Sequence, residues 1–302
     1  MRFSFWPQPT QSFEVIRSLA SHIEQSNWDG LWLADHFMPN AEDTNQPWPE
    51  AWTTIAAIAA TVPRIRLGTL VTGNTYRHPA VLAKMAATID HISGGRLVLG
   101  LGSGWQENEH EKYGIEFGTV ASRLRRLEEA CQVIKALFND ESANFSGEFY
   151  QLTDAPLLPK PKQENLPLLI GGGGEKVTLR ITAQYADEWN VWGTPETLKQ
   201  KMSVLDQHCD KLGRDPAAIQ RSAVALLFLS DDEALVKKMR ESEEAPARIA
   251  GNVSELRDII AAYQEAGVDE LIVPDFTMGP DCNQQKLDTL DTFINEVAPV
   301  VA

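Results

Sequence analysis

The chain has 302 residues, of which 43% are hydrophobic, enough to fill a large buried core. Its 27 basic and 42 acidic residues give a net charge of -15, and repulsion of this size argues against nucleic acid or an anionic membrane as a partner. Cys131, Cys209 and Cys282 lie far apart and form no CxxC pair, so the sequence predicts neither a disulfide framework nor a zinc site and favours the reducing cytoplasm.

The first residues, MRFSFWPQP, carry one basic residue and no long apolar segment, which is not the pattern of a signal peptide. No apolar run in the chain approaches the roughly 18 residues that a membrane-spanning helix needs. We therefore expect the first residues to form the first strand of the fold, and no membrane partner.

Short apolar runs that end in turn residues alternate with segments of helical periodicity. The predicted strands are 2–6, 31–34, 65–73, 96–104, 168–171, 188–192, 223–229 and 270–274. The predicted helices are 12–26, 50–62, 78–93, 121–138, 176–186, 195–211, 254–266 and 286–297, with a further charged helix from 233. Eight strands separated by helices predict an α/β protein, a (β/α)8 TIM barrel. An open doubly wound sheet is the alternative, because eight units fit both.

The alternation is interrupted between strands 4 and 5, over about residues 141–165. The stretch NFSGEFYQ, 144–151, has the pattern of a hairpin with its turn at Ser146 and Gly147, and a proline-rich segment follows it. We interpret this region as an insertion in a single domain that spans residues 1–302. Packing on the side of the barrel is favoured over a role as a lid.

Two predicted strands end in glycines. In LVLGLGSGW, 97–105, every second residue from Gly100 is a glycine, which lets a ligand approach the backbone closely. The second glycine run, 171–174, leads into a helix expected to begin near Glu175, and the unpaired N–H groups of a helix start favour a phosphate. A plain turn is the alternative there. GLGSG lacks the later glycine and the ribose-binding acid of a dinucleotide fingerprint, so a nicotinamide enzyme is disfavoured.

His36, beside Asp35 at the end of the second strand, is a candidate to give or accept a proton near neutral pH, although a strand-end histidine can also simply bind a loop. The histidines show neither HxH nor HExxH spacing, so no metal site is predicted. Acyl transfer is disfavoured because GxSxG is missing. Five tryptophans near the expected mouth favour a flat cofactor with a phosphorylated tail: Trp48, Trp52, Trp105, Trp189 and Trp192.

Three stretches carry a resemblance to a known family: LADHF at 33–37, LGTLVTGNTYRHPAVLAKMAATIDHISGGRLVLGLGSGW at 67–105 and LLIGGGGEKVTLRITAQYADEWN at 168–190. They resemble the luciferase-like superfamily, specifically its coenzyme F420-dependent oxidoreductases, over nearly the whole chain. The resemblance implies a barrel with an insertion, hydride transfer between F420 and a small organic substrate, and a homodimer.

Two other functions stay open beside that one. FMN is the alternative cofactor, since a ring pocket and a phosphate seat suit both, and the enzyme would then be a monooxygenase that uses reduced flavin and O2. The alternative of another class is a barrel that binds a phosphorylated ligand without redox chemistry. Aldolase-type Schiff-base chemistry is disfavoured because no predicted strand ends in a lysine.

The resemblance also implies the residues of a site. Asp35 and His36 would lie along the cofactor ring, with His36 as the group that binds the ring or protonates the substrate. At Leu70 and Val71 relatives carry a bulge, often with a cis peptide bond that does not involve proline. The remaining cofactor contacts implied are Gly73, Asn74, Ser103, Gly104 and Asn108, with Gly172, Gly173 and Gly174 as the phosphate seat.

Trp105 departs from the pattern of one subgroup. The sugar-phosphate dehydrogenases of the superfamily carry a glutamate proton donor at this place, so the resemblance does not imply that particular activity here. Glu107 and Glu109 follow closely, but as helix residues they are equally well interpreted as parts of a solvated face.

Overall fold

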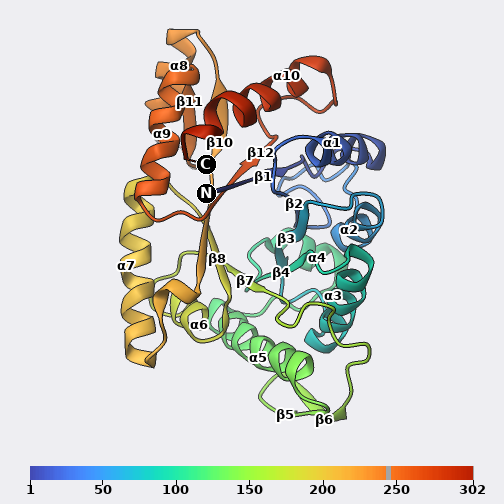
Figure 1. Cartoon of the computed structure of the whole chain (residues 1–302). Coiled ribbons are helices and arrows are strands. Elements are labelled where there is room, and N and C mark those ends of the chain that lie inside the picture. Colours follow the sequence, from blue (N-terminus) through green and yellow to red (C-terminus); the bar gives the residue numbers. More distant parts are fainter. Residues whose placement is uncertain (243–245, 302) are drawn as a thin grey trace.

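A computed structural model describes residues 1–242 and 246–301 and confirms the predicted barrel. Within these residues eight strands close into a ring in the order β1-β2-β3-β4-β7-β8-β9-β12, each parallel to its neighbours (Figure 1). The barrel strands are β1 (Arg2–Trp6), β2 (Gly30–Asp35), β3 (Arg66–Gly73), β4 (Leu97–Gly102), β7 (Leu168–Gly171), β8 (Glu188–Trp192), β9 (Gln220–Val224) and β12 (Glu270–Pro274).

Capping residues explain where several helices begin and end. The Ser12 side chain accepts a hydrogen bond from the Val15 N–H at the start of α1, which satisfies one of the free donors of the first turn. Gly94 ends α3 with φ +78°, a conformation that glycine adopts without strain. The helices are α1 (Phe13–Gln25), α2 (Ala51–Ala59), α3 (Pro79–Ser93), α4 (Glu107–Tyr113), α5 (Val120–Asn139), α6 (Thr178–Tyr185), α7 (Pro195–Leu212), α8 (Glu233–Arg240), α9 (Val253–Glu265) and α10 (Gln284–Thr292), with short turns η1 (Pro216–Ala218), η2 (Phe293–Val297) and η3 (Ala298–Val301).

The predicted strand 223–229 is wrong as a single element, because the chain leaves the barrel at Ala225. Residues up to Val224 pair with β8 and β12, whereas β10 (Leu226–Leu229) pairs with β11 (Arg248–Gly251) in a separate two-stranded sheet. A continuous apolar run does not reveal a change of pairing partner, since both halves are apolar strands.

The chain between β4 and β7 contains α4, α5 and a hairpin of β5 (Ala143–Ser146) and β6 (Gln151–Ala155). The hairpin lies against α5 at the edge of the molecule (Figure 1). The Gly147 N–H donates to the Tyr150 carbonyl at 3.0 Å, so the turn is centred on residues 148–149 and not on Ser146 and Gly147 as predicted. The Glu129 carboxylate of α5 accepts the N–H groups of residues 148–150 and holds this turn. The single-domain assignment with an insertion stays a prediction.

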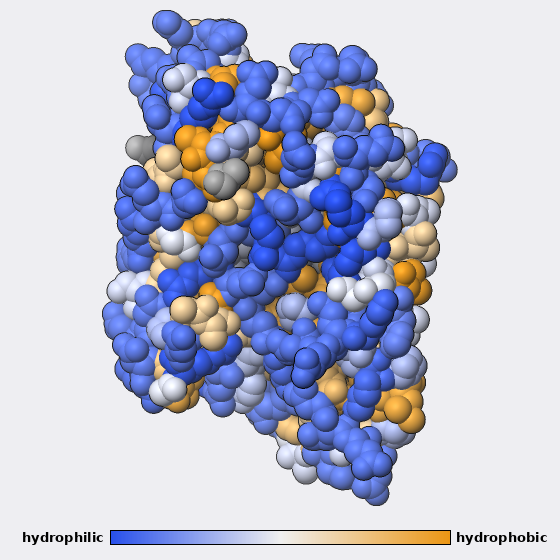
Figure 2. All heavy atoms as spheres, viewed as in Figure 1, coloured by the Kyte–Doolittle hydropathy of each residue, from blue (hydrophilic) through white to orange (hydrophobic). Residues whose placement is uncertain are grey.

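The buried side chains form two clusters. The larger one lies between the barrel and its helices, and a smaller one fills the barrel with residues that include Trp32, Val98 and Leu169. The face seen in Figure 2 is largely hydrophilic, as expected for a chain with net charge -15. Among the described helices, none combines the length and the apolar character that crossing a membrane requires.

Candidate active site

A cavity of about 940 Å³ opens at the carboxyl ends of the barrel strands, the end at which barrels of this type bind their ligands. Loops after β1, β2, β3, β4, β7 and β12 contribute to its wall, together with the last residues of β8. The structure therefore brings together these residues that the sequence analysis singled out: His36, Leu70, Val71, Gly73, Ser103, Gly104 and Gly172.

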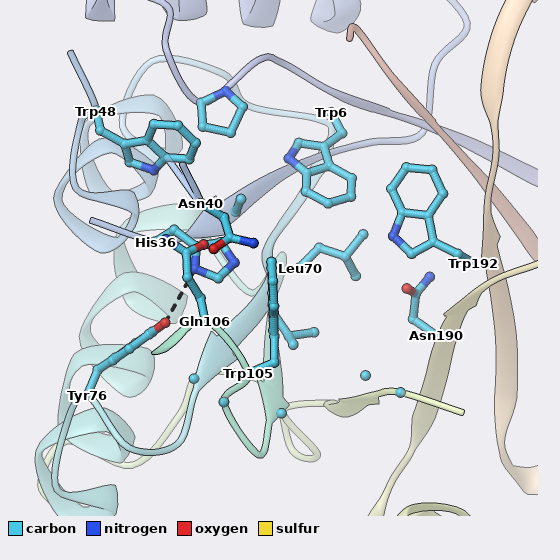
Figure 3. Close-up of a pocket in the computed structure, with 18 of the residues that line it drawn as sticks. Trp6, His36, Asn40, Trp48, Leu70, Tyr76, Trp105, Gln106, Asn190 and Trp192 are labelled. Carbon is cyan, nitrogen blue, oxygen red and sulfur yellow. Dashed lines mark hydrogen bonds between the residues drawn. The ribbon is translucent and has the colours of Figure 1, made fainter. Parts of the chain in front are cut away.

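His36 lies in this wall directly after β2, and a buried carboxylate holds its ring. Nδ1 of His36 is 2.8 Å from Oε1 of Glu109, and the other carboxylate oxygen accepts the Phe37 N–H at 2.8 Å. The edge of the His36 ring also meets Trp105, with 5.4 Å between the ring centroids. Because Glu109 occupies Nδ1, Nε2 is the ring nitrogen available to a ligand in the cavity (Figure 3).

Tyr76 completes this group. Its hydroxyl donates to Glu109 Oε1 and lies 3.3 Å from Nδ1 of His36 (Figure 3). Burial favours a higher pKa for Glu109, but hydrogen bonds from His36, Tyr76 and the Phe37 N–H outweigh it and hold this pKa below its ordinary value. Burial, and then the neighbouring Glu109, raise the pKa of the Tyr76 hydroxyl. Glu109 is therefore a carboxylate at neutral pH, and Tyr76 stays protonated.

The sequence alone did not identify Glu109 as part of this group. Glu107 is exposed, as a residue of a solvated face would be, but Glu109 is fully buried. The available clue was spacing: Gln106, Glu109 and His110 recur at three and four residues, which puts them on one face of α4. Nothing in that spacing says that the buried face meets His36, which is 73 residues away in the chain.

The bulge expected at Leu70 and Val71 is present. The peptide bond between them is cis, and the pairing of β3 with both neighbours shifts register at this point. The glycines of the neighbouring strand β4 make room for the bulge: a Cβ on Gly102 would meet the Val71 side chain at 2.8 Å, and one on Gly100 would meet the Thr69 carbonyl oxygen at 1.9 Å. The interpretation that Gly100 clears space for a ligand is therefore corrected, because protein backbone fills that space.

The glycine run after β7 lies at the edge of the cavity. Gly172, at φ +127°, is hydrogen-bonded on both sides, from its N–H to the Asn190 carbonyl and from the Trp189 indole to its own carbonyl. The helix that follows, α6, begins at Thr178, later than expected. Gly173 and Gly174 lie outside the cavity wall, and Gly173 faces Val191 and Lys201. A phosphate seat at these glycines stays a prediction.

Three other predicted site residues lie behind the wall. Asp35 is fully buried, and Arg77 pairs with it at 2.6 Å. Burial raises the pKa of this carboxyl, while Arg77 lowers it. Asn74 donates to the Tyr150 hydroxyl at 3.3 Å, and Asn108 donates to the Pro39 carbonyl at 2.9 Å. These positions support the loops of the mouth, and their roles as catalytic or cofactor contacts stay predictions.

Aromatic residues cover much of the remaining wall. Of the tryptophans expected there, Trp48, Trp105 and Trp192 line the cavity, whereas Trp52 and Trp189 are buried behind it. The sequence did not indicate that Trp6 and Phe276 would join them, because they come from opposite ends of the chain. The Trp6 ring lies 5.9 Å from that of Trp192 and 5.2 Å from that of Phe276. Within the described residues, no cluster of three His, Cys, Asp or Glu side chains could hold a metal ion.

With this geometry in place, comparison with known proteins decides the family. The family model described as luciferase-like monooxygenase matches residues 1–267. The chain belongs to the luciferase-like monooxygenase family. Among solved members of this fold, an F420-dependent secondary alcohol dehydrogenase superposes with a TM-score of 0.84 at 22% identity and covers 100% of this chain and 99% of its own. Monooxygenase RslO1 from Streptomyces bottropensis reaches 0.83 at 18% identity, covering 100% of both chains.

Relatives found by sequence carry the names of two kinds of enzyme, dehydrogenases and monooxygenases. An F420-dependent glucose-6-phosphate dehydrogenase of Amycolatopsis mediterranei is 36% identical over 169 residues, which are 55% of this chain and 48% of that protein. Pyrimidine monooxygenase RutA of Methylorubrum populi is 32% identical over 236 residues, 75% of this chain and 60% of that protein. The chain spans about half the length of the F420-dependent glucose-6-phosphate dehydrogenases that it matches in Amycolatopsis mediterranei and Kineococcus radiotolerans.

Proposed function

We propose that the protein is an oxidoreductase that transfers hydride between coenzyme F420 and a small organic substrate. The observation that carries this proposal is His36, held at Nδ1 by the buried carboxylate of Glu109 and facing a cavity of about 940 Å³ with its other nitrogen. The names of the dehydrogenase relatives support F420 as the cofactor.

The residues of the cavity fit such a cofactor. Apolar and aromatic side chains can accept a flat ring, with Leu70 and Val71 of the bulge as its backing and Gly73 at its edge. Gly172 lies at the cavity edge, and we place the phosphate beside Gly172, Gly173 and Gly174, which have no side chains of their own to cover the backbone. We assign Ser103 and Gly104 to the same binding site.

When bound, F420 supplies a carbon that accepts or releases hydride. The protein supplies orientation and the proton. Because Glu109 is ionised, Nδ1 of His36 keeps its proton and donates a hydrogen bond to the Glu109 carboxylate. Nε2 then has the lone pair that can accept the proton of an alcohol. In the reverse direction the protonated ring returns that proton to a carbonyl oxygen. Glu109 and Tyr76 position the ring, and the aromatic walls exclude water.

An FMN-dependent monooxygenase is the second candidate, favoured by the pyrimidine monooxygenase relative. A ring pocket and a phosphate seat serve both cofactors, so direct binding separates the two candidates. We expect F420 to bind the apoprotein more tightly than FMN when each is titrated and followed by fluorescence. Tighter binding of FMN would favour the monooxygenase, and binding of neither would refute both and leave a barrel without redox chemistry.

The phosphate seat can be tested in the same titration. Gly173→Asp sets a carboxylate beside the glycines and is expected to weaken cofactor binding about tenfold or more, because like charges repel strongly where water is partly excluded. Ala218→Asp adds the same charge at an exposed position near the amino end of β9, so its cofactor affinity should match that of the wild type. Equal cofactor affinities of the wild type, Gly173→Asp and Ala218→Asp would show that the phosphate does not bind at Gly172–Gly174.

We further propose that the substrate is a small molecule and that neither nucleic acid nor membrane is a partner, since the net charge of -15 opposes both. The three cysteines are free, Cys131 and Cys209 being buried, which suits the cytoplasm. A homodimer is proposed from the family resemblance alone.

A further inference from the structure

The wall of the cavity is nearly free of charge. In the part of the chain that the structure describes, no Lys, Arg, Asp or Glu side chain lines it. Charged side chains next to lining residues already have partners: Arg77 pairs with Asp35 and Glu50, Glu109 is bound by His36 and Tyr76, and Arg123 donates to backbone carbonyls. A substrate that carries a phosphate dianion would therefore lose its hydration and meet no Lys or Arg side chain in this wall.

Opposite His36 the wall is aromatic. Figure 3 shows Trp6 and Trp192 side by side. The Trp6 ring contacts that of Trp192 in a tilted pair and that of Phe276 edge-on, so the three rings form a cluster around Trp6. They come from three different strand ends, β1, β8 and the loop after β12, so they meet only once the barrel has closed. Rings in these orientations leave apolar faces on which a flat group can pack.

Trp6 also carries an unused donor. The residue is 7% exposed, and among the described residues its buried indole N–H has no hydrogen-bond partner. Figure 3 shows the indole nitrogen on the side of the ring that faces Trp48, within the space enclosed by the labelled residues. A buried donor without a partner costs free energy, and an acceptor oxygen on a ligand would recover it.

We propose that the substrate is uncharged, an inference that rests on the proposed function. The substrate is a flat, largely apolar alcohol or carbonyl compound that packs on Trp6, Trp192 and Phe276. An oxygen of this compound accepts the hydrogen bond of the Trp6 indole. Sugar phosphates are not substrates, in contrast to the glucose 6-phosphate in the name of the Amycolatopsis relative. The glycine seat does not change this, because the proposed cofactor occupies it.

The test uses protein first loaded with F420, whose bound fluorescence reports the cofactor separately from any substrate. Acetophenone, 1-phenylethanol and glucose 6-phosphate are then titrated calorimetrically. We expect the two aromatic probes to bind saturably and glucose 6-phosphate to show no saturable binding. Trp6→Phe keeps the ring but removes the N–H, and should weaken both aromatic probes on the order of fivefold. Trp192→Ala should weaken them by about tenfold or more.

Trp28→Phe is the matched control, because that indole N–H is also buried without a partner among the described residues but lies outside the cavity, against Phe293. It should leave the affinity of the probes unchanged. Thermal unfolding of each variant shows whether it is folded. Three results each overturn the proposal: glucose 6-phosphate binding as tightly as acetophenone, no saturable binding of either aromatic probe, or equal affinities of wild type, Trp6→Phe and Trp192→Ala. Failure to load F420 instead refutes the proposed function.

Discussion

At the scale of single residues, the chemistry of the cavity depends on a carboxylate that never touches it. Glu109 is fully buried and accepts from His36, from Tyr76 and from the Phe37 N–H. It thereby holds Nδ1 of His36 and leaves Nε2 for the cavity. Asp35, although it directly precedes His36, pairs with Arg77 and braces the loop. Glu109 is thus the positioning residue for His36.

Glu109→Gln is expected to lower kcat about 10- to 100-fold while the cofactor dissociation constant stays within roughly threefold, because outer partners orient the group that reacts. The neighbouring Glu107→Gln, exposed on the same helix, is the control and should leave both unchanged. Steady-state kinetics and the cofactor titration measure the two effects. Equal kcat values for the two variants would contradict the positioning role.

The same carboxylate predicts a dependence of stability on pH. The pKa of Glu109 is lowered in the folded protein, so its contribution to stability is complete above the ordinary carboxyl pKa and is lost as pH falls through the lowered value. The difference in the free energy of unfolding between wild type and Glu109→Gln should therefore be present above about pH 5 and shrink below about pH 4. Urea unfolding at several pH values checks this, and a difference that does not shrink below about pH 4 would contradict it.

At the scale of elements, the bulge of β3 and the glycines beside it form one packed unit. Val71 fills the space that side chains at Gly102 and Gly171 would need, and the Thr69 carbonyl fills the space at Gly100. Glycines spaced two apart on β4 are therefore a packing requirement of the neighbouring strand. They leave room for the bulge that brings Leu70 and Val71 into the cavity wall.

Gly102→Ala is expected to cost about 1–3 kcal/mol of the free energy of unfolding, because the added methyl group overpacks against Val71. Shortening the Val71 side chain should relieve this overpacking. The double variant Gly102→Ala/Val71→Ala should therefore lose less unfolding free energy than the two single variants lose in sum. Gly100→Ala meets a backbone carbonyl, so Val71→Ala should not rescue it. Urea unfolding of the single and double variants measures each loss, and strictly additive losses for Gly102 and Val71 would contradict the contact.

At the scale of the whole molecule, a charged network ties the barrel together at the end opposite to the cavity. Arg66 of β3 pairs with Glu188 of β8 at 2.5 Å and with Glu270 of β12 at 2.6 Å. Glu270 also accepts from Ser4 of β1 and Trp32 of β2. Burial favours a higher pKa for Glu270, but Arg66 and its other partners hold it below the ordinary value. Five strands of the closed barrel therefore share one buried network.

Arg66→Met should lower the free energy of unfolding by about 3–5 kcal/mol, since it leaves two carboxylates buried without their main cation. Cofactor affinity should be unchanged in the protein that remains folded, because the network lies at the other end of the strands. Arg125→Met, which breaks an exposed pair with Glu148, is the control and should change stability little. A stability loss as small as that of the control would show that the network does not hold the barrel.

The sequence by itself determined the alternation of strands and helices and the position of His36 at a strand end, and its family resemblance implied the bulge at Leu70 and Val71. These follow from local periodicity, from turn residues and from a resemblance carried by continuous stretches of chain. That the sheet closes into a barrel was decided by the tertiary structure. Only the tertiary structure decided that Glu109 binds His36, that Trp6 meets Trp192 and Phe276, and that Thr69 and Val71 fill the spaces beside the glycines. Each of these is a contact between residues of different barrel units. Such contacts depend on how the strands close and stagger, and the pattern of a single segment does not encode that geometry.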